Sequence, residues 1–220
     1  MSQPTDLKVE RVAEQWERWA KANAQGYITA GTYEGAQFYA SGLIEVGRVI
    51  EILATTKSYN PEHVILDYGC GTGRHALWFS LLFKGVVGVD ISATMISGAQ
   101  ETVAQRGIQN VALLCNQGHS LDLPDVSVDL VFSYITLMHN GRWAVNKLLH
   151  EFFRVLKPGS LAILQLPLVA DDDERKIPAD PGRVAKWTYK EFLQASGEAG
   201  FTALKLNNDA NGYHLLQRPR

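Results

Sequence analysis

The sequence predicts an α/β fold: a seven-stranded, mainly parallel, twisted sheet with helices on both faces, an antiparallel closing strand and an N-terminal helical cap. Two observations support this prediction. Short apolar runs alternate with segments of helical periodicity, which is typical of a parallel sheet covered on both faces. The last two strand-like segments follow one another closely, so we expect them to form an antiparallel pair.

The first part of the chain predicts a helical cap. Residues 9–21 and 43–54 carry apolar side chains at helical spacing, and the Gly- and Tyr-containing stretch 26–42 between them is expected to be a loop. We therefore divide the chain into a cap or lid of residues 1–57 and an α/β core of residues 58–220.

The core elements follow in regular alternation. Strands are expected at residues 64–67, 86–90, 111–115, 128–134, 161–166, 202–206 and 213–218. Helices are expected at residues 74–83, 92–106, 143–156 and 189–200. Ser92 is a suitable N-cap for the second of these helices, and Lys157-Pro158-Gly159 is suited to ending the third.

Composition and charge restrict the function. The chain has 220 residues, 46% of them hydrophobic and 20% charged, and its net charge is -2 at pH 7. This balance gives no electrostatic basis for a nucleic-acid or membrane partner. No apolar run reaches the ~18 residues of a membrane helix, and the first residues lack a signal peptide's apolar segment. We expect a cytoplasmic protein with Cys70 and Cys115 as free thiols.

Residues 64–73 read VILDYGCGTG, so three glycines directly follow a predicted strand. A tight turn would explain them, and so would a ligand that approaches the backbone too closely for a Cβ atom. The second explanation is favoured because ligands bind at the carboxyl ends of parallel strands. The spacing is not that of a dinucleotide site, since Arg74 stands where the third glycine of that motif belongs.

Asp90 ends the next predicted strand. A carboxylate in this position can accept hydrogen bonds from both ribose hydroxyls of an adenosine. It can also stabilise the N-terminus of the following helix, and the two roles are compatible.

Four motifs in order resemble those of class I S-adenosylmethionine-dependent methyltransferases: VILDYGCGTGR, VVGVDIS followed by Met95, SVDLVFSY, and RVLKPGSLAILQLP. They cover roughly residues 62–167. The resemblance implies S-adenosylmethionine as cofactor and S-adenosylhomocysteine as product. It also implies the cofactor contacts: Asp67, Gly69, Cys70 and Gly71 around the methionine, Asp90 at the ribose, Ile91 and Met95 at the adenine or ribose, and Ser133 and Tyr134 near the transferred methyl.

The chain departs from this family at the adenine contact. Family members often have an acidic residue in a Gly-Asp-Ala motif, where this chain has Gly118-His119-Ser120. A neutral histidine can accept a hydrogen bond, so His119 and Ser120 are the expected residues here.

His139, in SYITLMHNGRW, is the candidate catalytic residue. Similar methyltransferases carry a histidine facing the acceptor at this place, and it would act as a base; the alternative is a histidine that only stabilises its loop. Tyr27, Tyr33 and Tyr39 could form a lid over cofactor and acceptor, or simply pack. Two more aromatic residues, Trp143 and Trp187, are expected to flank the acceptor opening.

We expect no metal site. The acidic run at residues 171–174 (DDDE) lies on a polar, proline-containing connection, and consecutive carboxylates cannot all converge on one ion. A solvated turn explains this run.

Three functions are compatible with the sequence. The first is methylation of an oxygen or nitrogen of a small molecule, because no large substrate-recognition segment is present. The second is methylation of a peptide or protein N-terminus, and the third is a non-catalytic scaffold that binds S-adenosylmethionine. The segment Ser133-Tyr134-Ile135-Thr136 is not an Asn/Asp-Pro-Pro-Tyr motif, which argues against methylation of nucleobases or glutamine amides.

Overall fold

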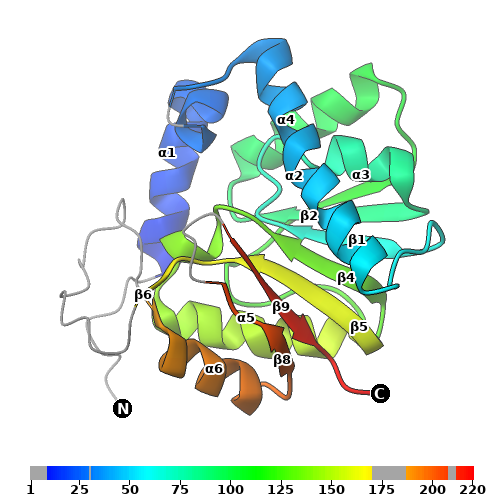
Figure 1. Ribbon diagram of the computed structural model, residues 1–220. Coiled ribbons are helices and arrows are strands. Elements are labelled where there is room, and N and C mark those ends of the chain that lie inside the picture. Colours follow the sequence, from blue (N-terminus) through cyan, green and yellow to red (C-terminus); the bar gives the residue numbers. More distant parts are fainter. Residues whose placement is uncertain (1–8, 30, 170–186, 208–211) are drawn as a thin grey trace.

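The computed structural model describes residues 9–29, 31–169, 187–207 and 212–220 (Figure 1). Seven strands form one sheet in the order β3-β2-β1-β4-β5-β9-β8. Their bounds are β1 Val64–Tyr68, β2 Gly85–Asp90, β3 Val111–Cys115, β4 Val128–Ser133, β5 Leu156–Gln165, β8 Thr202–Lys205 and β9 Tyr213–Gln217. β9 pairs antiparallel with β5 and β8, and the other pairings are parallel. The predicted fold class is confirmed.

Helices cover both faces of the sheet (Figure 1). On one face lie α2 (Gly35–Thr55), α3 (Ala76–Leu82) and α4 (Ala93–Gln105); on the other lie α5 (Arg142–Val155) and α6 (Tyr189–Glu198). α1 (Val9–Ile28) stands beside the sheet and packs on α4. Three small elements were not predicted: the 3₁₀ turn η1 (Leu137–His139) and the two-residue parallel strands β6 (Leu168–Val169) and β7 (Trp187–Thr188).

Each face of the sheet has its own hydrophobic core. Leu148, Phe152 and Phe192 pack between α5, α6 and the sheet, and each is fully buried. On the opposite face, the side chains of Val49 and Phe79 are fully buried against β1 and β4. Burial on both faces explains why the central strands are continuously apolar rather than alternating.

The predicted loop at residues 26–42 is wrong, because α1 continues to Ile28 and α2 already begins at Gly35. The glycines in this stretch have other roles. A Cβ at Gly42 would lie 2.5 Å from the carbonyl oxygen of Arg74, so glycine lets α2 pack directly on the backbone there. α1 kinks at Asn23, whose Oδ1 accepts a hydrogen bond from the Gly26 amide at 2.9 Å.

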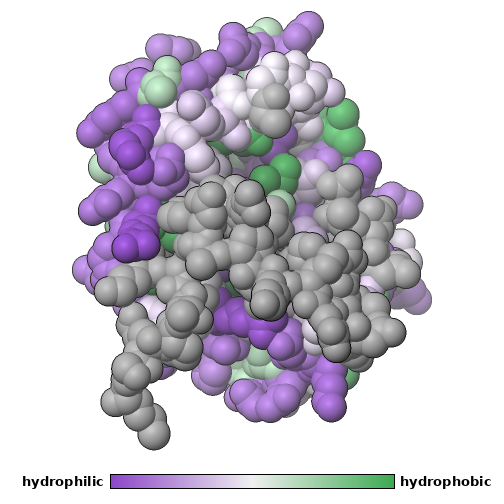
Figure 2. All heavy atoms as spheres, turned by 90° about the vertical axis from the view of Figure 1, so that its left-hand side faces the viewer, coloured by the Kyte–Doolittle hydropathy of each residue, from purple (hydrophilic) through white to green (hydrophobic). Residues whose placement is uncertain are grey.

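The predicted cap therefore consists of two parts that pack differently. Val46, Val49 and Leu53 of α2 belong to the buried core, whereas α1 lies over the carboxyl-terminal edge of the strands. Seen from the side of α1, the described surface is mainly hydrophilic, with hydrophobic residues in small separate areas (Figure 2). Among the described residues, no helix is long and apolar enough to cross a membrane.

The strand order reverses beside β1. The chain proceeds from β1 to β2 and β3 on one side, and then returns to β4 and β5 on the other. A crevice forms at the carboxyl ends of strands where such a reversal occurs. The glycine turn after β1 lies in this position.

Candidate functional site

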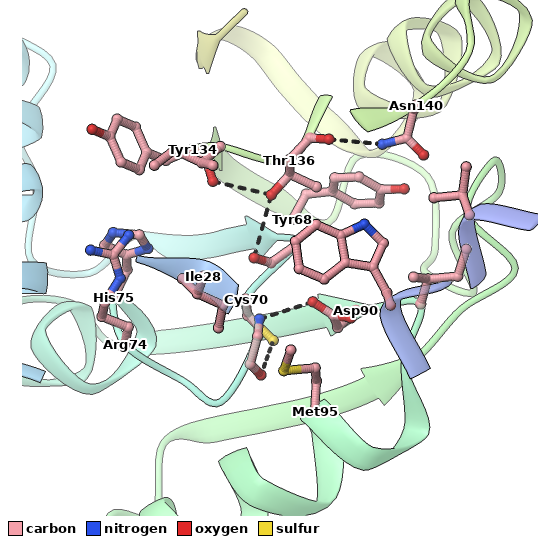
Figure 3. Close-up of a pocket in the computed structure, with 16 residues that line it drawn as sticks. Ile28, Tyr68, Cys70, Arg74, His75, Asp90, Met95, Tyr134, Thr136 and Asn140 are labelled. Atoms are coloured by element: carbon pink, nitrogen blue, oxygen red, sulfur yellow. Dashed lines mark hydrogen bonds between the residues drawn. The ribbon is translucent and has the colours of Figure 1, made fainter. Parts of the chain in front are cut away.

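A pocket opens at the reversal point, where β1, β2 and β4 end (Figure 3). Counted with its open side, it holds about 710 Å³ of empty space. The lining residues are Val12, Trp16, Ile28, Tyr68, Gly69, Cys70, Gly71, Arg74, His75, Asp90, Ile91, Met95, Tyr134, Ile135, Thr136 and Asn140.

The glycine turn forms the floor of the pocket. Gly69, Gly71 and Gly73 all have positive φ, at 78°, 53° and 86°, a conformation that other residues adopt only with strain. Space also excludes side chains: a Cβ at Gly69 would collide with Thr136, and a Cβ at Gly71 would lie 2.9 Å from Ile28 Cδ1. The turn therefore needs glycine for its own backbone conformation and for the close approach of the Thr136 and Ile28 side chains.

Asp90 faces this turn from the end of β2. Its Oδ2 accepts a hydrogen bond from the Gly71 amide, and its Oδ1 accepts one from the Ser92 amide, both at 2.9 Å. Each carboxylate oxygen has a second lone pair, so the group can also accept hydrogen bonds from a ligand. Burial raises the pKa of Asp90, and the hydrogen bonds from Ser92 and Gly71 oppose that rise.

Asp67 lies directly beneath the turn. Its side chain is 1% exposed, and its Oδ2 has no hydrogen-bond partner among the described residues. Burial raises the pKa of this carboxyl to about 7, although the charge of Arg74 acts in the opposite direction. Cys70 is buried in the turn itself, and burial raises its thiol pKa well above the usual value. The thiol is therefore protonated and is not an activated nucleophile.

α1 covers the pocket from above. Ile28 lies over Gly71, and Trp16 lines the opposite part of the cavity. Glu17 attaches this helix to the start of α4: its carboxylate accepts hydrogen bonds from Ser92 Oγ at 2.6 Å and from Thr94 Oγ1 at 2.5 Å. These bonds lower the pKa of Glu17 to about 2.

Residues 65–159 match the family model described as a methyltransferase domain. The curated "Uncharacterized methyltransferase YcgJ" of Bacillus subtilis is 32% identical over 111 residues, which are 50% of this chain and 43% of that protein. The "Malonyl-[acyl-carrier protein] O-methyltransferase" of Yersinia pestis is 35% identical over 102 residues, or 46% of this chain and 35% of that protein. The chain thus spans less than half the length of either relative.

Residues 65–159 therefore form a methyltransferase domain of the class I S-adenosylmethionine-dependent type. Solved structures agree on the fold. The crystal structure of YcgJ superposes with a TM-score of 0.61 at 23% identity, over 73% of this chain and 71% of that one. The [4+2]-cyclase SpnF superposes with a TM-score of 0.68 at 20% identity, over 88% and 73% of the two chains. The cyclase shows that the methyltransferase fold is also found in a protein named for another reaction.

Several residues expected from the methyltransferase motifs meet at the pocket. Those that line it are Gly69, Cys70, Gly71, Asp90, Ile91, Met95 and Tyr134. Ser133 does not: it is fully buried, and its hydroxyl donates to the Tyr68 carbonyl at 3.0 Å. Asp67 lies below the floor rather than on it.

His119 and Ser120, the residues expected in place of the family's acidic adenine contact, are not among the residues that line the pocket. The ring of His119 packs against Trp143 at 5.2 Å between centroids, and its Nδ1 is 3.0 Å from the Gln117 carbonyl. Ser120 is exposed, and its carbonyl accepts from Asn116. Their role at the adenine stays a prediction.

The three lid tyrosines also lie away from the pocket. Tyr27 stacks on Trp19 and Tyr33 is exposed, whereas the hydroxyl of Tyr39 bonds to Thr102 at 2.8 Å. The cap residues that do line the pocket are Val12, Trp16 and Ile28. In the sequence, the helical spacing of Val12 and Trp16 indicated only a packed helix, and Ile28 lay in the stretch expected to be a loop.

The two acceptor-side tryptophans are separated from the cavity. Trp143 is half-exposed beside His119, and Trp187 is buried against Phe192 with Arg142 over its ring. His139 does not line the pocket either. Its ring centroid lies 5.2 Å from that of Trp16, and Trp16 does line the pocket. Residues 171–174 lie outside the described residues, and no group of three metal-binding side chains occurs among those that are described.

Arg74, His75, Thr136 and Asn140 line the pocket but were not predicted to do so. The sequence drew attention to Arg74 only as the residue in place of a third glycine. Asn140 is buried, and its Nδ2 donates to the Thr136 carbonyl at 2.9 Å, which fixes the loop after β4.

Replacing Glu17 with glutamine is expected to loosen α1 without unfolding the core. The amide cannot reproduce the charge-assisted hydrogen bonds from Ser92 and Thr94, a loss of about 1–2 kcal/mol. Hydrogen exchange of α1 amides should become about 10-fold faster, while amides of α5 stay protected. Glu14→Gln, an exposed change on the same helix, is the matched control.

The native chain should show the same loosening in acid. Because the folded pKa of Glu17 is lowered to about 2 from 4.5, its contribution is complete above pH 4.5 and is lost as the pH falls toward 2. Equal exchange rates in Glu17→Gln and Glu14→Gln would show that this carboxylate does not hold the helix.

Proposed function

We propose that this chain transfers a methyl group from S-adenosylmethionine to an oxygen or nitrogen of a small molecule. The observation that carries the proposal is the pocket at the strand reversal, in which Asp90 lies beside the glycine turn and accepts a hydrogen bond from it. This arrangement suits a nucleoside whose ribose hydroxyls meet the carboxylate and whose remaining chain crosses the turn.

The chain's residues have defined tasks in this proposal. Asp90 accepts the ribose hydroxyls, and Ile91 and Met95 supply apolar surface to the nucleoside. Bound S-adenosylmethionine supplies an electrophilic methyl group on a sulfonium, which the acceptor displaces in line. The protein must therefore align the acceptor and exclude water, and α1 covers the pocket as this task requires.

His139 is the proposed base for an acceptor that loses a proton. Burial lowers its pKa to about 4, so its ring is neutral at pH 7 and one ring nitrogen can accept a proton. Its Nδ1 has no hydrogen-bond partner among the described residues. Its ring packs edge-on against that of Trp16, which lines the cavity.

His139→Ala is expected to lower kcat by roughly 10²-fold and to leave cofactor affinity unchanged. In the native chain, kcat should be constant above about pH 5 and fall as the ring is protonated near pH 4; this acid limb should be absent in the variant. His150→Ala, at an exposed position on α5, is the control. Unchanged kcat in His139→Ala would make His139 a structural residue.

The acceptor is proposed to be small because the described segments around the pocket are short. Curated relatives are named for methylation of oxygen and of nitrogen. One is a malonyl-[acyl-carrier protein] O-methyltransferase, and another is a phosphoethanolamine N-methyltransferase of Arabidopsis thaliana. The net charge of -2 gives no support for a nucleic-acid acceptor.

Calorimetry with S-adenosylmethionine and with S-adenosylhomocysteine tests the cofactor first. Transfer of labelled methyl groups to pooled small molecules, and separately to peptides with free N-termini, then tests the acceptor class. Label in the small-molecule pool supports the proposal, and label in peptides alone supports the N-terminal alternative. Binding without transfer to either pool would indicate a scaffold.

A further inference from the structure

A second cleft lies at the opposite edge of the sheet from the pocket described above. It is formed by the turn after α2, the first residues of β4 and β5, and Arg220, and it holds about 930 Å³ of empty space, counted with its open side. The C-terminus lies on the side of the molecule away from α1 (Figure 1). His63 directly precedes β1 and Gly69 directly follows it, so the length of this strand, about 16 Å, separates the two sites. A small ligand in this cleft would not reach the pocket.

The side chains that line the cleft are mainly basic. Three of them are cationic, Lys57, Lys157 and Arg220, and Asp129 is the acidic one. Lys157 neutralises Asp129, because its Nζ donates to both carboxylate oxygens, at 2.8 and 2.9 Å. Neither Lys57 nor Arg220 forms an ion pair within 4.0 Å with a carboxylate of the described residues. The cleft therefore keeps two positive charges that the described part of the chain does not compensate.

Lys57 has a backbone conformation that favours glycine. It directly follows the end of α2, with φ at 54°. Its amide donates to the Ala54 carbonyl at 3.1 Å, and the Ser58 amide donates to the Leu53 carbonyl at 2.8 Å. This is the hydrogen-bond pattern of a helix end whose left-handed residue is usually glycine, because a Cβ atom is strained there. The chain thus forgoes some stability at a position whose side chain lines the cleft.

The remaining walls of the cleft have fixed positions. Arg220 lies along the backbone of Gly159, since a Cβ at Gly159 would lie 3.4 Å from Arg220 Cγ. The Gly159 amide donates to the Arg218 carbonyl at 2.8 Å, which attaches this turn to the segment after β9. His63 also lines the cleft, and its Nδ1 has no hydrogen-bond partner among the described residues. This nitrogen is a third group whose binding capacity the described residues leave unused.

We propose that this cleft binds a phosphoryl group through Lys57 and Arg220. A phosphate ester carries about -1.5 to -2 charge at pH 7 and three acceptor oxygens, so cations from two separate segments can share it. Arginine matches phosphate oxygens with its fork of N–H donors, and lysine binds them as a point charge. A carboxylate carries one charge and would leave one of the two cations uncompensated. The phosphoryl group comes either from a free phosphate anion or from a small phosphate ester.

Calorimetry with pyrophosphate and with glycerol 3-phosphate, at constant ionic strength, tests the proposal on the full chain. We expect binding at one site and a higher unfolding temperature in the presence of the bound probe. Binding of pyrophosphate alone would assign the cleft to a free anion, and binding of glycerol 3-phosphate alone would assign it to an ester. Binding of neither probe would overturn the proposal.

Charge-removing variants then locate the bound probe. Lys57→Met and Arg220→Met should each raise its Kd at least ~10-fold, as expected for the loss of a charge-assisted hydrogen bond. Lys147→Met removes an equal charge at an exposed position of α5 and should change the Kd less than 2-fold. An equal loss in Lys147→Met, or an unchanged Kd in either cleft variant, would overturn the proposal.

Lys57→Gly separates binding from folding. Glycine removes the ammonium group but suits the left-handed backbone at this helix end. The variant should therefore bind the probe as weakly as Lys57→Met and unfold at a temperature no lower than Lys57→Met does. Native-like affinity in Lys57→Gly would show that the loss in Lys57→Met comes from a distorted turn and not from the missing cation.

Discussion

Asp90→Ala is expected to weaken the binding of S-adenosylhomocysteine by about 2–4 kcal/mol, or roughly 30- to 1,000-fold. The change removes a carboxylate that lines the pocket and that we propose accepts both ribose hydroxyls. Two charge-assisted hydrogen bonds would be lost at once, and the ligand hydroxyls would be desolvated without a partner. Calorimetry measures the loss directly.

The same change could weaken binding indirectly, because Asp90 also holds the amides of Gly71 and Ser92. A ligand without the 2′ and 3′ hydroxyls distinguishes the two causes. Removing the hydroxyls should weaken binding to the native chain about as much as the mutation does, and should have little further effect on Asp90→Ala. Additive losses would mean that Asp90 acts on the turn and not on the ribose.

Local sequence patterns predicted the sheet well because its central strands are buried on both faces. VILD and VVGVD are continuously apolar up to their final aspartates, and this pattern has few alternatives beside a glycine turn. The error at residues 26–42 has the opposite origin. Gly42 is a helix residue that serves contact with a backbone 32 positions later in the chain, at Arg74, and no local pattern contains that information.

The residues of the candidate site show the same contrast between local sequence patterns and distant contacts. Asp90 and the glycines were predicted because they stand at strand ends, which the topology brings together. Trp16 and Ile28 were missed because their places over the pocket depend on how α1 docks, and the docking depends on Glu17 reaching Ser92 and Thr94 some 75 positions away. Function at this site therefore combines a locally encoded turn with a cover encoded by distant contacts.

Asp67→Asn is expected to stabilise the chain at neutral and alkaline pH. The folded pKa of Asp67 is raised to about 7 from 3.8, so the folded state binds a proton that the unfolded state has released. A raised pKa contributes stability that is complete below pH 3.8 and is lost as the pH rises through 7. Between pH 4 and pH 8 the loss amounts to about 4 kcal/mol, and asparagine, which does not ionise, avoids it.

Urea unfolding of both chains from pH 4 to pH 8 tests this expectation. The free energies of unfolding should be similar near pH 4 and should diverge with rising pH, with Asp67→Asn the more stable. Asp122→Asn removes an equal charge from an exposed position and should follow the native chain throughout. Parallel curves for Asp67→Asn and the native chain would mean that Asp67 is already ionised in the folded state at pH 5. In that case the charge of Arg74 would compensate the buried carboxylate. The substitution Arg74→Met should then strongly destabilise the native chain at pH 8, but it should not destabilise the Asp67→Asn chain.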